Sequence, residues 1–173
     1  MTQTTTLESP LGSIQLYADN GALVAVELRS QTRPQLPTTS EGSAATTRIL
    51  ERAAAQLTEY FLGQRTAFDV PLAPQGTDFQ RLVWTQLAAI PHGETRSYRD
   101  IAVAVGRPAA SRAVGAANAR NPIAIIVPCH RVIGANGTLT GYAGGLAAKR
   151  WLLEHEHHQL RVDFDAPPSW VRP

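Results

Sequence analysis

The sequence predicts an α/β N-terminal domain with a small antiparallel sheet and a helix, followed by a mainly α-helical domain with a helix-turn-helix. Two strand-like stretches at 13–18 and 22–28 flank the turn sequence DNG, which is typical of a hairpin. From residue 44 onward, apolar residues recur every three or four positions, which indicates helices. The predicted segments are a first domain at 1–76, a second domain at 77–160 and a tail at 161–173.

The composition favours a folded protein in a reducing compartment. Apolar residues make up 43% of the 173 positions, which is ordinary for a globular protein. No apolar run approaches the length of a membrane span, and the first ten residues do not resemble a secretory signal. The single cysteine, Cys129, excludes an internal disulfide and a cysteine-rich zinc site. We therefore expect a cytoplasmic protein with no membrane partner.

Charge is unevenly distributed between the two halves. Residues 1–76 carry five Arg against seven acidic residues, whereas 77–160 carry nine basic against five acidic residues, so the net charges are −2 and +4. Arg accounts for 15 of the 16 basic residues, and its planar guanidinium suits phosphate contacts. A GC-rich genome would also favour Arg over Lys. The uneven distribution of charge between the two halves is therefore better evidence of a binding partner than the high share of Arg. It indicates a polyanionic partner for the second half.

The first domain begins with the predicted hairpin, whose turn is DNG at 19–21. Residues 33–43 are rich in Pro, Ser and Thr and are predicted to form a loop. A helix is predicted from Ala44 to Gly63, because its apolar positions share one face. Those positions are Ile49, Leu50, Ala53, Leu57, Tyr60 and Phe61. A short strand at Ala67–Leu72 and a linker at 73–76 complete the domain.

Two helix starts in the second domain carry capping signatures. Thr77 with Gln80, and Ser97 with Asp100, have the spacing of a capping box. The helix after Thr77 is amphipathic and ends before the sequence PHGE. Its expected apolar face consists of Phe79, Leu82, Val83, Leu87 and Ile90.

A pair of short helices follows. Residues 98–105 form the first and are stopped by Gly106, and Pro108 is expected in the first turn of the second, which runs to residue 120. Two helices joined by a tight turn indicate a helix-turn-helix, although many such pairs bind nothing. Small residues in the second helix permit either close approach of a partner or tight internal packing. They are Ala109, Ala110, Ala113, Gly115, Ala116 and Ala117.

The only cysteine follows a stretch, AIIVP at 124–128, that is predicted to be a buried strand. A lone cysteine is usually a small buried hydrophobic residue. A reactive thiol needs a base or cation nearby, and His130 and Arg131 are candidates. Adjacent side chains on a strand point to opposite faces, so His130 would reach the thiol only through a water or after a turn at Pro128.

The C-terminal part of the chain supplies a candidate carboxylate. Residues 134–145 form a predicted glycine-rich loop that permits close approach to a ligand, and 146–157 form a final helix. Glu156 lies one helical turn from Leu152 and Leu153, which places a carboxylate near an apolar face. It is either a partner for a catalytic base or a solvated residue at a helix end.

Several short motifs in the second half of the chain occur in a characteristic order and spacing. PCHRV at 128–132 is followed by LTGYAGGLAAKRWLLEHE at 139–156, and SY, RAVG and NP stand at 97–98, 112–115 and 121–122. Together they closely resemble the O6-alkylguanine-DNA alkyltransferase family, over about residues 77 to 156. The N-terminal half matches this family only in general outline.

The resemblance implies a ribonuclease-H-like first domain with a structural role and a winged helix-turn-helix in the second. It implies that Cys129 permanently accepts an alkyl group from O6 of guanine, without a cofactor, so that each chain acts once. His130 would act as the base through a water, and Glu156 would orient His130. Whether O4-alkylthymine is also accepted stays open.

The resemblance also implies residues that hold the guanine. Tyr98, the backbone at Val132 and the loop at Tyr142 and Ala143 would contact the base. Asn121 would fix the turn that joins the second helix of the pair to the nucleophile.

The implied partner is double-stranded DNA that contains O6-alkylguanine. Arg112 would fill the gap that the extruded base leaves, and Ala110 and Ala113 would let the helix lie in a groove. Ser97 is a further implied DNA contact. We expect a monomer in solution, and clustering of several copies along DNA stays open.

Two departures and two rival interpretations remain. Some family members have Ser where this chain has Ala143, so a hydroxyl contact is lost here. Some carry a zinc site in the first domain, which one cysteine cannot build. The histidines of HEHH at 155–158 are expected to be solvated at a helix end and not to bind a metal. The rivals are a non-catalytic module that binds alkylated bases, which the retained Cys129 disfavours, and a Cys–His hydrolase.

Overall fold

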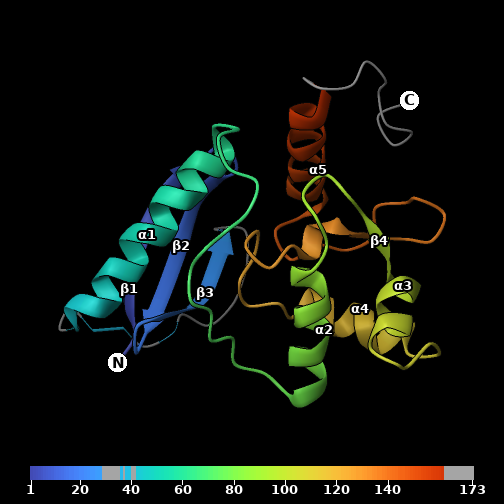
Figure 1. The fold of residues 1–173 in the computed structure, drawn as a ribbon, viewed down its shortest axis with the longest axis horizontal. Helices are drawn as coiled ribbons and strands as arrows, with labels where there is room; N and C mark the ends of the chain where they lie inside the picture. Colours follow the sequence, from blue (N-terminus) through green and yellow to red (C-terminus); the bar gives the residue numbers. More distant parts are fainter. Residues whose placement is uncertain (29–35, 37, 40–41, 162–173) are drawn as a thin grey trace. The chain divides into compact units, whose positions relative to one another are not determined.

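The computed structural model describes residues 1–28, 36, 38–39 and 42–161, and only the backbone of 158–161. The predicted tail and much of the predicted loop at 33–43 therefore lie outside the described residues. The chain forms two compact units (Figure 1). The first contains residues 1–76 and 122–126, and the second contains 77–121 and the described residues from 127 onward. The sequence carries no signal for the return of 122–126 to the first unit.

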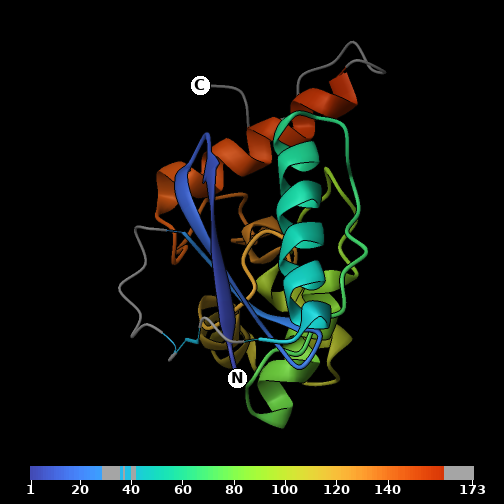
Figure 2. The same cartoon turned by 90° about the vertical axis from the view of Figure 1, so that its left-hand side faces the viewer.

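The first unit contains a three-stranded antiparallel sheet in the order β1-β2-β3, formed by Gln3–Ser9, Gly12–Asp19 and Ala22–Leu28. Asn20 and Gly21 both have positive φ, at 47° and 76°, as a two-residue type I′ hairpin requires. Helix α1, Ala44–Phe61, lies along the sheet (Figure 2). Its N-cap is Ser43, whose hydroxyl oxygen accepts from the Thr46 amide at 3.1 Å.

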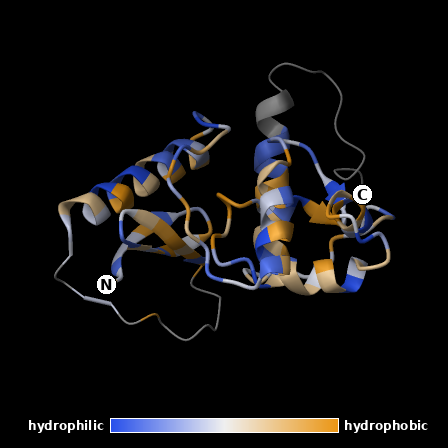
Figure 3. Cartoon of the chain, turned by 60° about the horizontal axis from the view of Figure 1, so that its bottom comes forward, coloured by the Kyte–Doolittle hydropathy of each residue, from blue (hydrophilic) through white to orange (hydrophobic). Residues whose placement is uncertain are grey.

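The core of the first unit lies between the sheet and α1. Hydrophobic residues predominate in β3, whereas α1 carries both hydrophobic and hydrophilic positions (Figure 3). The sheet contributes buried side chains that include Ile14, Leu16 and Leu23, and α1 contributes Leu50, Ala53, Leu57 and Tyr60.

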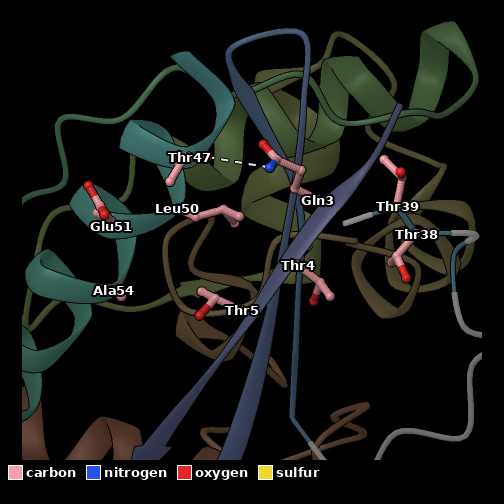
Figure 4. Close-up of a pocket in the computed structure, with 9 residues that line it drawn as sticks. All are labelled: Gln3, Thr4, Thr5, Thr38, Thr39, Thr47, Leu50, Glu51 and Ala54. Atoms are coloured by element: carbon pink, nitrogen blue, oxygen red, sulfur yellow. Dashed lines mark hydrogen bonds between the residues drawn. The ribbon is translucent and has the colours of Figure 1, made fainter. Parts of the chain in front are cut away.

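Two strand assignments from the sequence were incomplete or wrong. Strand β1 was missed because it is rich in Thr and Gln, and a half-exposed strand of this kind has little apolar alternation. Its polar side chains line a hollow beside α1, where Gln3 Nε2 donates to Thr47 Oγ1 at 3.3 Å (Figure 4). The strand predicted at Ala67–Leu72 is absent, since only Leu72 forms a bridge, with Leu23.

The second unit contains helices α2 (Asp78–Ala88), α3 (Tyr98–Ala104), α4 (Ser111–Ala119) and α5 (Leu146–Arg161). Strands β4 (Arg96–Ser97) and β5 (Val132–Ile133) pair in parallel. Both predicted capping boxes are present, at Thr77–Gln80 and Ser97–Asp100. None of the described helices is long and apolar enough to cross a membrane.

Two details of these helices differ from the prediction. Leu82 is exposed, and the buried face of α2 instead includes Trp84, whose indole N–H donates to the Ala117 carbonyl at 2.8 Å. Pro108 lies in a turn before α4, because that helix begins only at Ser111 with Ala110 as its N-cap.

Candidate active site around Cys129

The chain reaches Cys129 through a series of tight turns, and the predicted strand at 124–128 is wrong. Ile126 N donates to Ala124 O at 2.8 Å across Ile125, whose φ of 71° is strained for a β-branched residue. Cys129 N donates to Val127 O at 2.8 Å across Pro128, whose φ of −82° and ψ of 66° define an inverse γ-turn. A 3₁₀ turn, η1 (Cys129–Arg131), follows. The alternation of a strand therefore does not apply to Cys129 and His130.

Two buried asparagines hold this turn to the end of α4. Asn121 Nδ2 donates to Val127 O at 2.8 Å, and Asn118 Nδ2 approaches Cys129 O at 3.4 Å. Both side chains are buried, so each amide replaces the water that would otherwise satisfy these carbonyls. A displacement of α4 would therefore move the backbone that carries the thiol.

His130 and Glu156 contact each other inside the second unit. His130 Nε2 lies 2.6 Å from Glu156 Oε1, and the two side chains are 0% and 1% exposed, so the helix-end alternative for Glu156 is wrong. Arg131 makes a bidentate contact with the same carboxylate, with Nε and Nη2 each at 2.9 Å, and its Nη1 donates to Ile90 O at 2.6 Å. The carboxylate is thus fixed by two neighbouring residues of η1, the turn that begins at Cys129 and is the candidate nucleophile turn.

The charge of Glu156 is stabilised in this setting. Burial alone would raise the pKa of Glu156. The charge of His130 when it is protonated, the hydrogen bonds of His130 and Arg131, and the charge of Arg131 outweigh burial and hold the pKa far below its usual value. An ionised Glu156 accepts the Nε2–H of His130. The lone pair of a neutral His130 is then on Nδ1, a buried atom with no hydrogen-bond partner in the described structure.

The residues expected to hold a base lie on β5, α3 and the loop before α5. The Tyr142 hydroxyl is buried without a hydrogen-bond partner among the described residues, and burial together with the charges of Cys129 and Glu156 raises its pKa well above the usual value. Tyr98 OH accepts from Thr140 Oγ1 at 3.0 Å, which joins α3 to this loop. Val132 is buried on β5, whereas Ala143 is exposed.

The expected DNA contacts lie apart from this buried group, on the surface of the second unit. Arg112 and Ala113 are exposed in the first turn of α4, and Ala110 is half-buried at its N-cap. The Ser97 hydroxyl oxygen accepts from the Asp100 amide at 3.0 Å and thereby caps α3. Among the described residues, no cluster of His, Cys, Asp and Glu could hold a metal ion.

Two buried cations of the second unit, Arg131 and Lys149, were not predicted to have these positions. Arg131 was considered only as a charge beside the thiol, whereas its guanidinium positions Glu156. Lys149 was not considered, although it is the only lysine in the chain and lies seven residues before Glu156, on the same face of the helix. The position of Arg131 two residues after Cys129 and the spacing of Lys149 from Glu156 can both be read from the sequence. Neither of them shows which atoms the two cations contact.

Comparison with known proteins identifies the family of this chain. The 6-O-methylguanine DNA methyltransferase family matches in two parts, its ribonuclease-like domain over residues 3–74 and its DNA binding domain over 78–158. The chain belongs to this family. Its relatives include the methylated-DNA–protein-cysteine methyltransferases of Methanosarcina barkeri, 49% identical over 90% of this chain and 97% of the relative, and of Mycobacterium tuberculosis, 48% identical over 92% and 94%.

Solved structures of this family have the same architecture. The structure of Mycobacterium tuberculosis OGT in complex with DNA superposes with a TM-score of 0.81 at 48% identity, over 91% of this chain and 93% of that one. The structure of the O6-methylguanine methyltransferase from the same organism gives 0.80 at 45% identity, over 98% and 97%. The small antiparallel sheet unit and the helical unit predicted from the sequence are therefore confirmed.

Proposed function

We propose that this protein repairs alkylated DNA directly, by moving the alkyl group from O6 of guanine to Sγ of Cys129. The observation that carries the proposal is the 2.6 Å contact between His130 Nε2 and Glu156 Oε1, because it leaves Nδ1 as the nitrogen that can act as a base. His130 directly follows Cys129, the only cysteine of the chain. The similar proteins are methylated-DNA–protein-cysteine methyltransferases, and one of them is described in complex with DNA.

The reaction follows from the groups present. His130 Nδ1 takes the thiol proton through a water, and the Glu156 carboxylate stabilises the imidazolium that results. Sγ attacks the alkyl carbon, the S–C bond forms, and the C–O6 bond breaks with its electron pair on O6. Backbone N–H groups of the loop at Tyr142 and Ala143 stabilise the charge on O6, and the proton that left the thiol passes from His130 through water to the guanine anion, which restores guanine and neutral His130. The thioether is not cleaved, so each chain acts once and needs no cofactor.

Delivery of the base depends on α3 and α4 acting as a helix-turn-helix. The target atom is stacked inside the duplex, so the nucleotide must be extruded, which costs a few kcal/mol. Arg112 stacks in the vacated space, and the small side chains of Ala110 and Ala113 let α4 approach the groove. Repair cannot depend on sequence, so phosphate contacts made by the basic half supply the affinity. Tyr98 and the backbone at Val132 hold the extruded guanine.

The decisive experiment uses duplex DNA with a labelled methyl group on O6 of one guanine. We expect label to appear on the protein, at no more than one equivalent per chain, and to be absent from Cys129→Ala. Cys129→Ala should still bind unmodified duplex, because its side chain makes no phosphate contact. Binding without transfer by the parent protein would instead support a recognition module, and repeated turnover would support a hydrolase.

A further inference from the structure

Lys149 occupies a costly position in the second unit. It is the only lysine of the chain, its side chain is fully buried on α5, and burial lowers its pKa to about 8, against a smaller opposing effect of the Cys129 charge. Burying an ammonium ion costs free energy unless all its protons are bonded. The ammonium group of Lys149 is therefore expected to bond to acceptors inside the protein.

The ammonium group joins two separate segments. Nζ donates to Val132 O at 2.5 Å and to Thr140 O at 2.8 Å, and Gly141 O lies at 3.5 Å. Val132 belongs to β5, immediately after the nucleophile turn. Thr140 and Gly141 precede Tyr142 in a glycine-rich loop that has no helix or strand of its own.

These two segments carry candidate base contacts, which are Val132 on β5 and Tyr142 and Ala143 in the loop. Thr140 also bonds to Tyr98 OH at 3.0 Å, and after burial the charge of Cys129 is the next cause of the raised pKa of the Tyr142 hydroxyl. Lys149 is thus bonded to the carbonyls that set the separation between β5 and the loop. Since transfer requires the alkyl carbon in line with Sγ, a loop displaced by an ångström would be unproductive.

We propose that Lys149 is a positioning residue, which sets the width of the guanine site by tying Val132 on β5 to Thr140 and Gly141 in the loop. The inference rests on the proposed function, because it concerns the same base site. Lys149 does not touch the reacting atoms.

Lys149→Met tests the role, because it keeps the unbranched stem and removes the charge and the three donors. The probe is the free base O6-methylguanine, which avoids phosphate contacts. Lys149→Met should raise the base concentration needed for half-maximal transfer about tenfold or more. Arg150→Met, which removes an exposed cation from the next position of α5, should stay within about twofold of the parent. Unmodified duplex should bind Lys149→Met about as tightly as it binds the parent, because the buried Lys149 makes no phosphate contact.

An unchanged half-maximal concentration in a folded Lys149→Met protein would overturn the positioning role. It would leave the proposed function intact, since the parent would still transfer the methyl group. A parent protein that transfers no label from duplex DNA would instead refute the proposed function itself.

A second measurement does not depend on the folding of a Lys149 variant. With one lysine in the chain, ¹³Cε-labelled lysine gives a single side-chain signal in NMR spectra. In Cys129→Ala, which cannot accept the alkyl group, this signal should shift when O6-methylguanine is added. No shift at concentrations where equilibrium dialysis shows bound base would overturn the proposal.

Discussion

At the scale of single residues, one carboxylate organises the site. Glu156 bonds to both His130 and Arg131, which are consecutive in the turn that begins with Cys129. A fixed carboxylate serves two purposes, because it selects the tautomer of His130 and stabilises its protonated form. Removing the charge of Glu156 should therefore change both the rate of alkyl transfer and the pH dependence of stability, and the two effects can be measured independently.

For chemistry, Glu156→Gln should lower the rate of transfer from free O6-methylguanine about 100-fold, the scale of general base catalysis. Glu154→Gln is the matched control, because Glu154 is exposed on the same helix and no described contact joins it to the site. The rates come from single-turnover transfer of label. If both variants react at the parent rate, Glu156 has no part in activating the thiol.

For stability, the lowered pKa of Glu156 predicts a dependence on acid pH. The folded pKa lies below the unfolded value of about 4.3, so the contribution is fully present above that pH and is lost as pH falls towards the folded pKa. Urea unfolding of the parent should show a free energy that declines below about pH 5. Glu156→Gln should lack much of this decline, whereas Glu154→Gln should keep it.

At the scale of elements, α4 has two functional ends. Its last turn and the residues that follow place Asn118 and Asn121 against the nucleophile turn, while its first turn exposes Arg112. A short helix thus connects the surface where DNA is expected to the thiol. The small residues between the two ends suit both internal packing and approach to a groove.

Arg112→Ala should slow repair of duplex DNA about tenfold, since stacking against bases contributes roughly 1–3 kcal/mol. Reaction with the free base should be unchanged, because no nucleotide has to be extruded. Arg120→Ala changes an exposed arginine at the other end of α4 and should affect the duplex reaction less. Equal losses on duplex and free base would exclude the stacking role.

At the scale of the whole molecule, charge divides the chain. The net charge is −2 over residues 1–76 and +4 over 77–160, and the exposed arginines of the second unit include Arg99, Arg107, Arg112, Arg120 and Arg150. Electrostatic attraction to phosphates is therefore concentrated in the unit that carries the thiol.

Affinity for unmodified duplex should fall linearly with salt on a log–log scale, with a slope of about −0.9 per phosphate contact. Transfer from the free base should change little over the same salt range, because that reaction involves no phosphate. Fluorescence anisotropy and label transfer measure the two quantities. An equal salt dependence of both would mean that salt acts on the catalytic site and not on DNA binding.

Local chemistry explains what the sequence determined. Capping boxes at Thr77 and Ser97, the Asn20–Gly21 turn and the apolar period of α1 are all specified within a few residues, so the elements follow from them. The motif at 128–132 likewise indicated Cys129 and His130 as candidate site residues. Strand β1 was not predicted because its polar residues give little apolar alternation. The tight turns at 124–127 were not predicted because an apolar run does not distinguish turns from a buried strand, and the turn at Pro128 was expected only as one alternative.

The tertiary structure alone decided how those residues meet. The contact of His130 with Glu156 spans 26 positions, and Lys149 bonds to carbonyls 17 and nine positions away. Contacts of this kind depend on how α5 packs against the nucleophile turn, and no local preference encodes that packing. A sequence specifies which groups can ionise or bond, and only packing brings two of them within bonding distance and away from water.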